Sequence, residues 1–352
     1  MAKQILVTGG AGFVGSNLVN SLLGDGFNVL VFDALLRRGS EHNVAWLRHQ
    51  HRNSQLQVVK GDVRDFEAVR AAVHGVDVIY HLAGQVAVTS SVQDPRTDFE
   101  INALGTFNVL EATRLSERRP VILFTSTNKV YGGMEDVAVV ESMSRFKYRD
   151  FPQGIPESQP LDFHSPYGCS KGAADQYVRD YARIYNLPTV IFRMSCIYGP
   201  RQFGTEDQGW LAHFMIAAAT GKAITIYGNG KQVRDVLFVD DLVRAFRMAV
   251  EKIDTVAGGV FNIGGGPPNA MAVWQEFGAI LAELKGEKIP VSYDDWRAGD
   301  QPCYVSDVRK AGQRLDWQPL IDKETGVRRL WEWVSSNKSL FETPAKEQQL
   351  ES

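Results

Sequence analysis

The chain has little cysteine, no long apolar run and almost no excess of either charge. Its 352 residues include three cysteines, Cys169, Cys196 and Cys303, an odd number without the spacing of metal ligands. We therefore expect no bound metal and no disulfide framework, as in a reduced, cytoplasmic protein. No apolar stretch approaches the roughly 20 residues that span a bilayer, and the N-terminus lacks a signal-peptide pattern. These absences argue against secretion and against a membrane protein.

The charge balance also argues against nucleic acid as a partner. The formal net charge is -3 and the pI is about 6.2, so no basic field is available to hold a phosphate backbone. Hydrophobic residues make up 44% and charged residues 22%, as in globular proteins. A chain of this length can form one large domain or two lobes.

Short runs rich in Val, Ile and Leu alternate with longer amphipathic segments. This pattern predicts an α/β fold of the Rossmann type, a doubly wound parallel sheet covered by helices on both faces. One helix should begin near Phe13 and another should cover residues 97–115. The expected strands are Gln4–Thr8, Asn28–Asp33, Leu56–Lys60, Val76–His81, Val121–Ser126 and Thr189–Arg193.

Beyond Tyr198 the alternation weakens, and glycine-rich breaks appear at residues 227–230 and 264–268. We expect a dinucleotide-binding domain over residues 1–195 and a smaller substrate-binding lobe over residues 196–342. Strand-like runs at Val236–Val239 and Val260–Ile263 predict that the chain returns to the first domain near residues 236–263. Residues 343–352 form a polar tail.

A glycine-rich turn follows the first strand and opens the first helix. Gly9, Gly12 and Gly15 form G-x-x-G-x-x-G. The first glycine allows a tight turn, the second lets the backbone approach a pyrophosphate, and the third lets the helix pack on the sheet. Phe13 and Val14, at the helix start, complete this predicted phosphate cradle.

Asp33 ends the second strand, where a carboxylate can bind the adenosine ribose. Because that carboxylate would repel a 2′-phosphate, the sequence favours NAD over NADP. Arg37 and Arg38 nearby keep NADP as the alternative. The ends of the third and fourth strands add further predicted cofactor contacts: Asp62, Val63, Leu82, Ala83 and Gly84. For Asp62, a helix cap is the competing interpretation.

Tyr167 and Lys171 are four residues apart in a helical stretch, so both face the same way. A nearby ammonium and a positively charged nicotinamide ring both favour the phenolate, which predicts that Tyr167 is a general base and a cofactor contact together with Lys171. Thr127, at the end of the fifth strand, supplies a hydroxyl at the same sheet edge. We expect it to bind the reacting sugar oxygen.

At these residues the chain resembles the extended short-chain dehydrogenase/reductase family, and within it the nucleotide-sugar epimerases and dehydratases. The glycine turn, Thr127, Tyr167 and Lys171 carry the resemblance, which extends from Gly9 to about Trp333. It implies that Asn102 contributes to the cofactor site. It also implies a sugar-nucleotide site that includes Arg201, Arg234 and Arg297, of which the last two hold the diphosphate.

The resemblance also bears on the reaction. Dehydratases of the family carry an Asp-Glu pair just after the catalytic threonine, where this chain has Asn128 and Lys129. An amide and an ammonium cannot perform that acid and base work in the same way, which disfavours dehydration. An epimerase instead oxidises one sugar hydroxyl to a keto group and returns the same hydride to the other face.

Several stretches resemble the 2-epimerases that invert C2 of a CDP-linked deoxyhexose, of the CDP-paratose to CDP-tyvelose type. They are residues 84–87, 126–132, 161–171 and 207–210. Many 4-epimerases have an asparagine where Cys196 stands. The predicted substrate contacts are Gln85, Ser126, Asn128, His164, Cys196, Arg201, Gln208, Arg234 and Arg297.

Two other functions stay open, a UDP-sugar 4-epimerase and a catalytically inactive NAD-sensing protein. The resemblance also implies a homodimer or larger homo-oligomer, with residues 97–115 and 167–185 supplying a four-helix interface. Their apolar stripes could equally be ordinary core. The connection over residues 133–160 is either an active-site lid or an interface loop.

Overall fold

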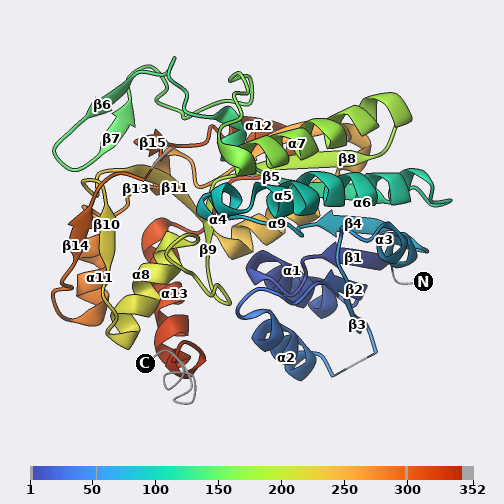
Figure 1. Ribbon diagram of the computed structural model, residues 1–352, viewed down its shortest axis with the longest axis horizontal. Coiled ribbons are helices and arrows are strands. Elements are labelled where there is room, and N and C mark those ends of the chain that lie inside the picture. Colours follow the sequence, from blue (N-terminus) through green and yellow to red (C-terminus); the bar gives the residue numbers. More distant parts are fainter. Residues whose placement is uncertain (1–2, 53, 298–299, 343–352) are drawn as a thin grey trace.

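The computed structural model describes residues 3–52, 54–297 and 300–342, and a seven-stranded parallel sheet runs through its centre (Figure 1). The strand order is β12-β8-β5-β4-β1-β2-β3. The chain builds the sheet outward from β1 in one direction and then from β4 in the other, so the order reverses between these two strands. This confirms the predicted doubly wound α/β fold. The strands are β1 (Gln4–Thr8), β2 (Asn28–Asp33), β3 (Leu56–Lys60), β4 (Val78–His81), β5 (Val121–Thr127), β8 (Thr189–Met194) and β12 (Gly259–Ile263).

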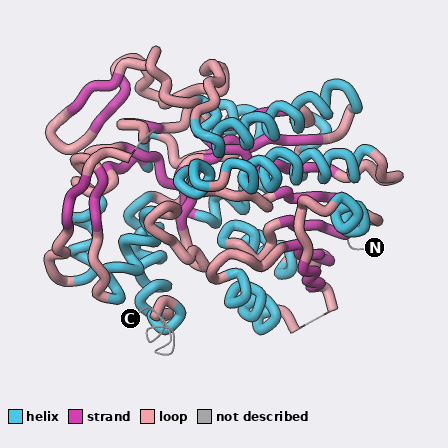
Figure 2. The backbone as a smooth tube through the Cα atoms, in the orientation of Figure 1, coloured by secondary structure: helices cyan, strands magenta, loops and turns pink. Residues whose placement is uncertain are grey.

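Helices cover both faces of the sheet, which explains why its central strands read as continuous apolar runs (Figures 1 and 2). Leu6 and Ile79 pack on one face, while Val7 and Leu123 pack on the other. The first face carries α3 (Phe66–Val73), α6 (Gly105–Arg114) and α7 (Ser165–Tyr185). The second carries α1 (Phe13–Gly24) and α9 (Val239–Glu251), with α2 (Ser40–Gln50), α10 (Ile253–Val256) and α12 (Arg309–Leu315) beside them.

The predicted helix over residues 97–115 consists of three segments. After the short α4 (Val88–Gln93), Asp94 caps α5 (Pro95–Phe99) by accepting a hydrogen bond from the backbone of Thr97. A π-helical turn, η1 (Glu100–Leu104), then leads into α6. Such turns are rare and often occur at functional sites; this one contains Asn102.

A second part of the molecule follows β8. Its strands are β9 (Cys196–Tyr198), β11 (Val233–Phe238), β13 (Ala270–Ala272) and β15 (Cys303–Tyr304), which form one sheet, and β10 (Thr225–Tyr227) and β14 (Ser292–Asp294), which form a pair. Its helices include α8 (Trp210–Thr220), α11 (Phe277–Lys285), α13 (Lys323–Ser336) and the 3-10 turns η3 (Pro267–Asn269) and η4 (Lys338–Leu340).

The chain returns to the seven-stranded sheet only at β12, since β11 belongs to the second sheet. The exact domain boundaries stay a prediction. The predicted polar tail, residues 343–352, lies outside the described residues.

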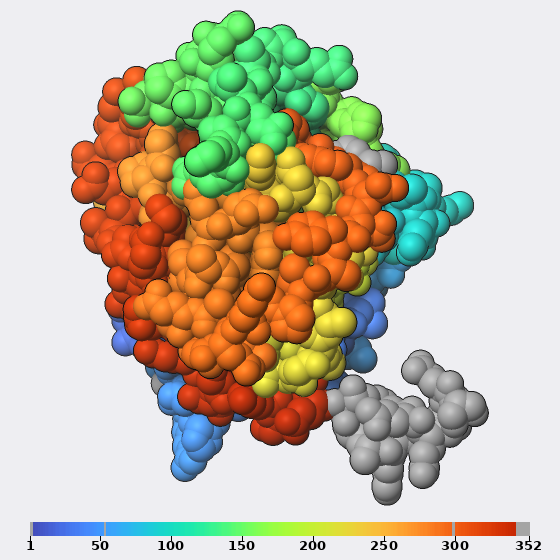
Figure 3. Space-filling view, turned by 90° about the vertical axis from the view of Figure 1, so that its left-hand side faces the viewer, coloured from blue at the N-terminus to red at the C-terminus, as the bar shows by residue number. Residues whose placement is uncertain are grey.

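The connection over residues 133–160 contains a hairpin, β6 (Val139–Glu141) and β7 (Phe146–Tyr148). In Figure 3 this green segment lies over the orange part of the chain. Arg145 forms an ion pair with Glu276, and the Phe146 ring packs edge-on against Trp296. The hairpin is therefore attached to the second part of the molecule.

Cys169, Cys196 and Cys303 are all free thiols. Within the described residues, no helix is both long enough and apolar enough to cross a bilayer.

Candidate active site

A cavity of about 600 Å³ follows the carboxyl edge of the seven-stranded sheet and continues into the second part of the molecule. Ligands of doubly wound sheets bind at this edge, next to the point where the strand order reverses. Three predicted site residues, Gln85, Asn102 and His164, do not line the cavity. The cavity brings the others together: Gly9, Gly12, Phe13, Val14, Gly15, Asp33, Asp62, Val63, Leu82, Ala83, Gly84, Ser126, Thr127, Asn128, Tyr167, Lys171, Cys196, Arg201, Gln208, Arg234 and Arg297.

The glycine-rich turn has a conformation that requires glycine. Gly9 has φ of +70°, and a Cβ atom there would lie 2.7 Å from the backbone nitrogen of Ala83. A Cβ atom on Gly15 would lie 2.2 Å from the carbonyl oxygen of Gly9. Gly12 is the N-cap of α1, so no side chain caps the first turn of this helix. An uncapped helix start beside a cavity suits a phosphate group, and the turn therefore fits a dinucleotide.

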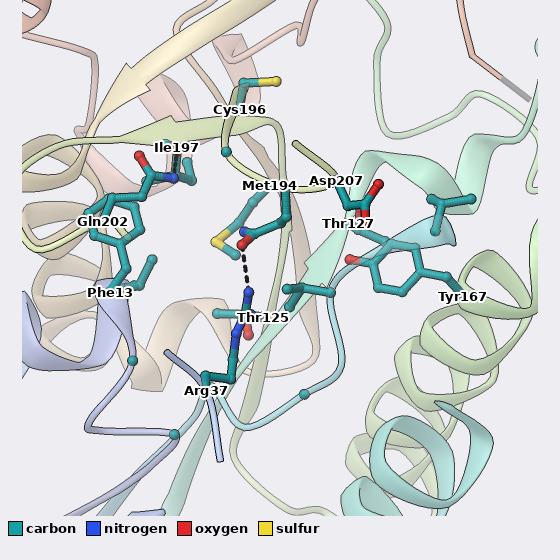
Figure 4. Close-up of a pocket in the computed structure, with 18 of the residues that line it drawn as sticks. Phe13, Arg37, Thr125, Thr127, Tyr167, Met194, Cys196, Ile197, Gln202 and Asp207 are labelled. Carbon is teal, nitrogen blue, oxygen red and sulfur yellow. Dashed lines mark hydrogen bonds between the residues drawn. The ribbon is translucent and has the colours of Figure 1, made fainter. Parts of the chain in front are cut away.

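Asp33 lies beside this turn, at the end of β2. Its carboxylate accepts hydrogen bonds from the backbone N–H groups of Ala11, at 3.0 Å, and Leu35, at 2.8 Å. Burial raises the pKa of Asp33 above its ordinary value. Arg37 extends into the cavity (Figure 4). It donates a hydrogen bond to Oε1 of Gln208 at 2.7 Å. Asp33, which is expected to favour NAD, and Arg37, which is expected to favour NADP, thus line the same cavity. Arg37 also contacts Gln208, a predicted substrate residue.

Asp62 lines the cavity and is not a helix cap. Its carboxylate forms an ion pair with Arg64, with the closest atoms 2.7 Å apart, and this pairing lowers the pKa of Asp62. The cap of α3 is Asp65, which accepts a hydrogen bond from the backbone N–H of Ala68. The alternative interpretation of Asp62 was therefore wrong, because the helix begins three residues later than a cap at Asp62 would require.

Thr127 and Tyr167 face the same cavity from β5 and α7 (Figure 4), and Lys171 lines it one helical turn after Tyr167. Burial raises the pKa of Tyr167 to about 12, although the neighbouring Thr127 hydroxyl acts in the opposite direction. The ammonium of Lys171 donates to the carbonyl oxygen of Thr125 at 2.7 Å, and burial lowers the pKa of Lys171 to about 8. The three residues meet as the sequence predicts, whereas burial outweighs the predicted stabilisation of the phenolate.

Asn102 belongs to a buried network behind the cavity. It donates to Asp98 and to Ser170, both at 3.1 Å, and accepts from the backbone of Gln85 at 3.0 Å. Ser170 also donates to Asp98 at 2.5 Å. This network joins η1 to α7 and to the loop after β4, so Asn102 and Gln85 position the site from outside its wall. His164 is exposed just before α7.

The far end of the cavity contains two arginines that already have carboxylate partners. Arg234 forms an ion pair with Asp300, with the closest atoms 2.5 Å apart. Arg297 donates to the carboxylate of Glu206 at 3.0 Å, and its guanidinium lies 3.9 Å from the centre of the Tyr227 ring. Both guanidinium groups are thereby held in fixed orientations, which suits the binding of a diphosphate.

The remaining predicted substrate residues line the middle of the cavity. The buried hydroxyl of Ser126 has no hydrogen-bond partner within the described residues. Asn128 accepts a hydrogen bond from Thr127 at 3.3 Å. Burial raises the pKa of the Cys196 thiol, and the Arg201 guanidinium lies 4.3 Å from the ring centre of Trp46. A polar ligand could therefore contact Asn128 without displacing a strong existing contact, whereas protein atoms cover the Ser126 hydroxyl.

The chain that forms this turn, triad and cavity matches a known protein family. A family model described as GDP-mannose 4,6 dehydratase matches residues 6–330. The chain belongs to this extended short-chain dehydrogenase/reductase family. The membership confirms the predicted class, an NAD-dependent nucleotide-sugar enzyme, and the predicted cofactor NAD.

Relatives within the family perform different reactions. A CDP-paratose 2-epimerase from Salmonella typhi is 42% identical over 344 residues, which cover 95% of this chain and 99% of that protein. The UDP-glucose 4-epimerase of Thermotoga maritima, solved with UDP-glucose, has 31% identity and a TM-score of 0.81, with 95% and 99% coverage. A dTDP-glucose 4,6-dehydratase from Streptomyces venezuelae, solved with NAD bound, has 28% identity and the same TM-score, with 96% and 98% coverage.

The site of this family member also contains residues that the sequence did not point to. Lys129, Glu206 and Tyr227 line the cavity, and Asp98 supports it from behind. Lys129 stands two residues after Thr127, a position that indicates only that dehydration is disfavoured. The other three had no local signal, because their roles depend on contacts with residues distant in the sequence.

Proposed function

We propose that the protein inverts C2 of a CDP-linked hexose or deoxyhexose by oxidising it transiently to a keto sugar. The observation that carries this proposal is the cavity wall around Thr127, where the hydroxyl meets the buried Tyr167 phenol and is followed by the amide of Asn128 and the ammonium of Lys129. These groups suit reversible oxidation of a hydroxyl better than elimination of water. The 42% identity to a CDP-paratose 2-epimerase supports cytidine and C2 in particular.

In the proposed reaction, Thr127 binds the sugar hydroxyl oxygen at C2 and Tyr167 removes its proton. When bound, NAD would supply the acceptor and donor of the C2 hydride and a positively charged ring that favours the tyrosinate. Lys171 lies one helical turn after Tyr167 on α7, and its side chain lines the same part of the cavity. The keto sugar turns its other face before the hydride returns, so the configuration is inverted. Burial keeps water away from the keto sugar in the meantime.

The cofactor assignment within the site is part of the proposal. Gly9, Gly12 and Gly15 would hold the pyrophosphate on the start of α1, and Asp33 would bind the adenosine ribose. At the other end, Arg234 would hold the nucleotide diphosphate together with Arg297.

A direct experiment is to incubate the enzyme with CDP-glucose or CDP-paratose and to follow the sugar by NMR. We expect a product inverted at C2. In deuterated water, C2 should acquire no deuterium, because the hydride that leaves C2 is the one that returns. Absence of C2 inversion with both substrates contradicts the proposal, and solvent deuterium at C2 would indicate proton abstraction at carbon instead.

A UDP-sugar 4-epimerase is the second candidate, favoured by the structural similarity to the Thermotoga maritima enzyme. UDP-glucose serves as the discriminating substrate, since inversion at C4 with no activity on CDP-sugars would favour this alternative. An inactive NAD sensor is a poorer explanation, because sensing needs the glycine turn but not Thr127, Tyr167 and Lys171.

We further propose that the enzyme is a homodimer and acts in the cytoplasm. Apolar side chains on neighbouring helices α6 and α7 are exposed, including Phe107 at 37%, Tyr177 at 49% and Ile184 at 63%. Phe107 and Tyr177 contact each other edge-on, so they form one continuous apolar surface. Light scattering should give twice the chain mass, and Phe107→Glu should give a monomer.

A further inference from the structure

Lys129 is a cation on the cavity wall that no step of the proposed reaction uses. It lies in η2 (Asn128–Tyr131), the 3-10 turn that follows β5. Its backbone N–H donates to the Thr127 hydroxyl at 3.2 Å. This bond fixes the start of the Lys129 side chain relative to the hydroxyl that we assign to the reacting sugar oxygen.

The ammonium of Lys129 has weak protein contacts. Within the described residues it donates one hydrogen bond, to Oε1 of Gln301 at 3.4 Å, near the long limit for such a bond. No carboxylate among those residues lies within ion-pair distance of it, in contrast to Arg234, which pairs with Asp300. Burial and the positive charge of Arg234 together lower the pKa of Lys129 to about 8, while the charge of Asp300 acts in the opposite direction. The site therefore holds a partly desolvated cation that has no carboxylate within ion-pair distance among the described residues.

The charges around Lys129 favour an anionic ligand. Lys129 and Arg234 carry positive charges, and Asp300 offsets one of them, which leaves a net charge of about +1. A phosphate oxygen would supply the charge-assisted bond that Gln301 cannot supply.

The position of this cation has a consequence for which sugar carbon reacts. In a nucleotide sugar the phosphate is attached to C1, which is bonded to C2 and lies across the ring from C4. The Lys129 backbone is bonded to the Thr127 hydroxyl, so a phosphate bound by the Lys129 ammonium lies within about one lysine side-chain length of the catalytic residues. This placement favours reaction at a carbon next to C1 over reaction at a carbon across the ring.

We propose that Lys129 determines specificity by binding the phosphate attached to C1 of the sugar, which presents C2 to Thr127 and Tyr167. The regiochemical part of this inference rests on the proposed function, whereas the binding of the sugar-side phosphate does not. Arg234, whose charge acts on Lys129, would share the same phosphate.

The test compares two nucleotides that differ by the sugar-side phosphate, namely CDP and CMP. Their affinities are measured by calorimetry on the NAD-loaded enzyme and on Lys129→Met, Lys129→Arg and the control Lys147→Met, which alters an exposed lysine on β7. We expect Lys129→Met to weaken CDP by about tenfold or more and CMP by less than about twofold. Lys129→Arg should restore most of the affinity for CDP, and Lys147→Met should change neither value.

The pH dependence gives an independent measurement. Lys129 is charged below its pKa of about 8, so the affinity of the wild type for CDP should fall as the pH rises above this value. The fall should be absent in Lys129→Met and in Lys129→Arg, because neither side chain changes its charge in this range.

Equal losses for CDP and CMP, or no loss for CDP, would overturn the inference, provided that the melting temperature and NAD content of Lys129→Met match the wild type. If these two properties do not match, the affinity of Lys129→Arg for CDP is compared with that of the wild type across pH. The inference is overturned if the affinity of Lys129→Arg depends on pH in the same way as that of the wild type. These outcomes are separate from the proposed function, because they need no turnover. Failure of C2 inversion with an intact difference between CDP and CMP would contradict the proposed function alone.

Discussion

Substituting Gly15 by alanine should empty the cofactor site, and the structure gives the reason in distances. A Cβ atom at this position would lie 2.2 Å from the carbonyl oxygen of Gly9 and 2.6 Å from Cα of Gly10. Both neighbours are backbone atoms of the turn, so no side chain can rotate to relieve the clash. Overpacking at a site that can partly relax costs about 1–3 kcal/mol, and we expect at least about 3 kcal/mol here. The turn must open, and the phosphate cradle opens with it.

The same helix offers a matched control. Gly24 is the last residue of α1, is exposed, and has open space where its Cβ would be. Alanine at this position should gain about 0.5–1 kcal/mol of helix stability, because glycine loses more conformational freedom on folding. Both variants make the same chemical change in one helix, and only one of them affects the turn.

The assay measures the NAD that co-purifies with each variant and the melting temperature of each protein. Gly15→Ala should retain at most about one tenth of the wild-type NAD, with a lower melting temperature that added NAD does not restore. Gly24→Ala should retain its NAD, with a melting temperature unchanged or about 1–2 °C higher. Wild-type NAD content and stability in Gly15→Ala would refute the argument from the close approach of the backbone.

Three further predictions concern the catalytic base, the cofactor choice and the buried charge pair. Tyr167→Phe should abolish epimerisation while NAD stays bound; turnover within about tenfold of wild type would contradict the assigned base. Asp33→Ala should shift the ratio of NAD to NADP affinity toward NADP by about tenfold or more, since it removes a carboxylate that repels the 2′-phosphate, and an unchanged ratio in a binding titration would refute this. The Arg193 guanidinium is 3% exposed and lies 2.9 Å from the Asp175 carboxylate. Asp175→Asn leaves this buried guanidinium without a counter-charge and should lower the free energy of unfolding, measured in urea, by about 3–5 kcal/mol. The control Asp150→Asn breaks an exposed pair and should cost at most about 1 kcal/mol; equal losses in both variants would contradict the role of burial.

Local patterns in the sequence predicted the sheet well but predicted the irregular helix poorly. Apolar runs of four to six residues identify strands that helices cover on both faces, and their bounds agree with the structure within about two residues. The single helix expected over residues 97–115 has a π-turn at Glu100–Leu104. The turn is held by one local and one tertiary contact, because Asn102 bonds to Asp98 four residues before it and to Ser170 on α7.

The sequence by itself determined the glycine turn, the carboxylate at Asp33 and the meeting of Tyr167 with Thr127. These features depend on spacing along one element or on parallel strands ending at one edge, and both are local properties of the chain. The tertiary structure decided which charged side chains find which polar or charged partners. Arg37 reaches Gln208 across 171 residues, and Arg297 reaches Glu206 across 91.

The balance of charges around Lys129 was likewise decided by the tertiary structure alone. The sequence places this lysine beside Thr127, but its pKa and its lack of a carboxylate partner depend on Arg234, Asp300 and Gln301, which come from distant parts of the chain. Electrostatic energies change with distance and burial, and both are fixed only when the two parts of the molecule pack around one cavity.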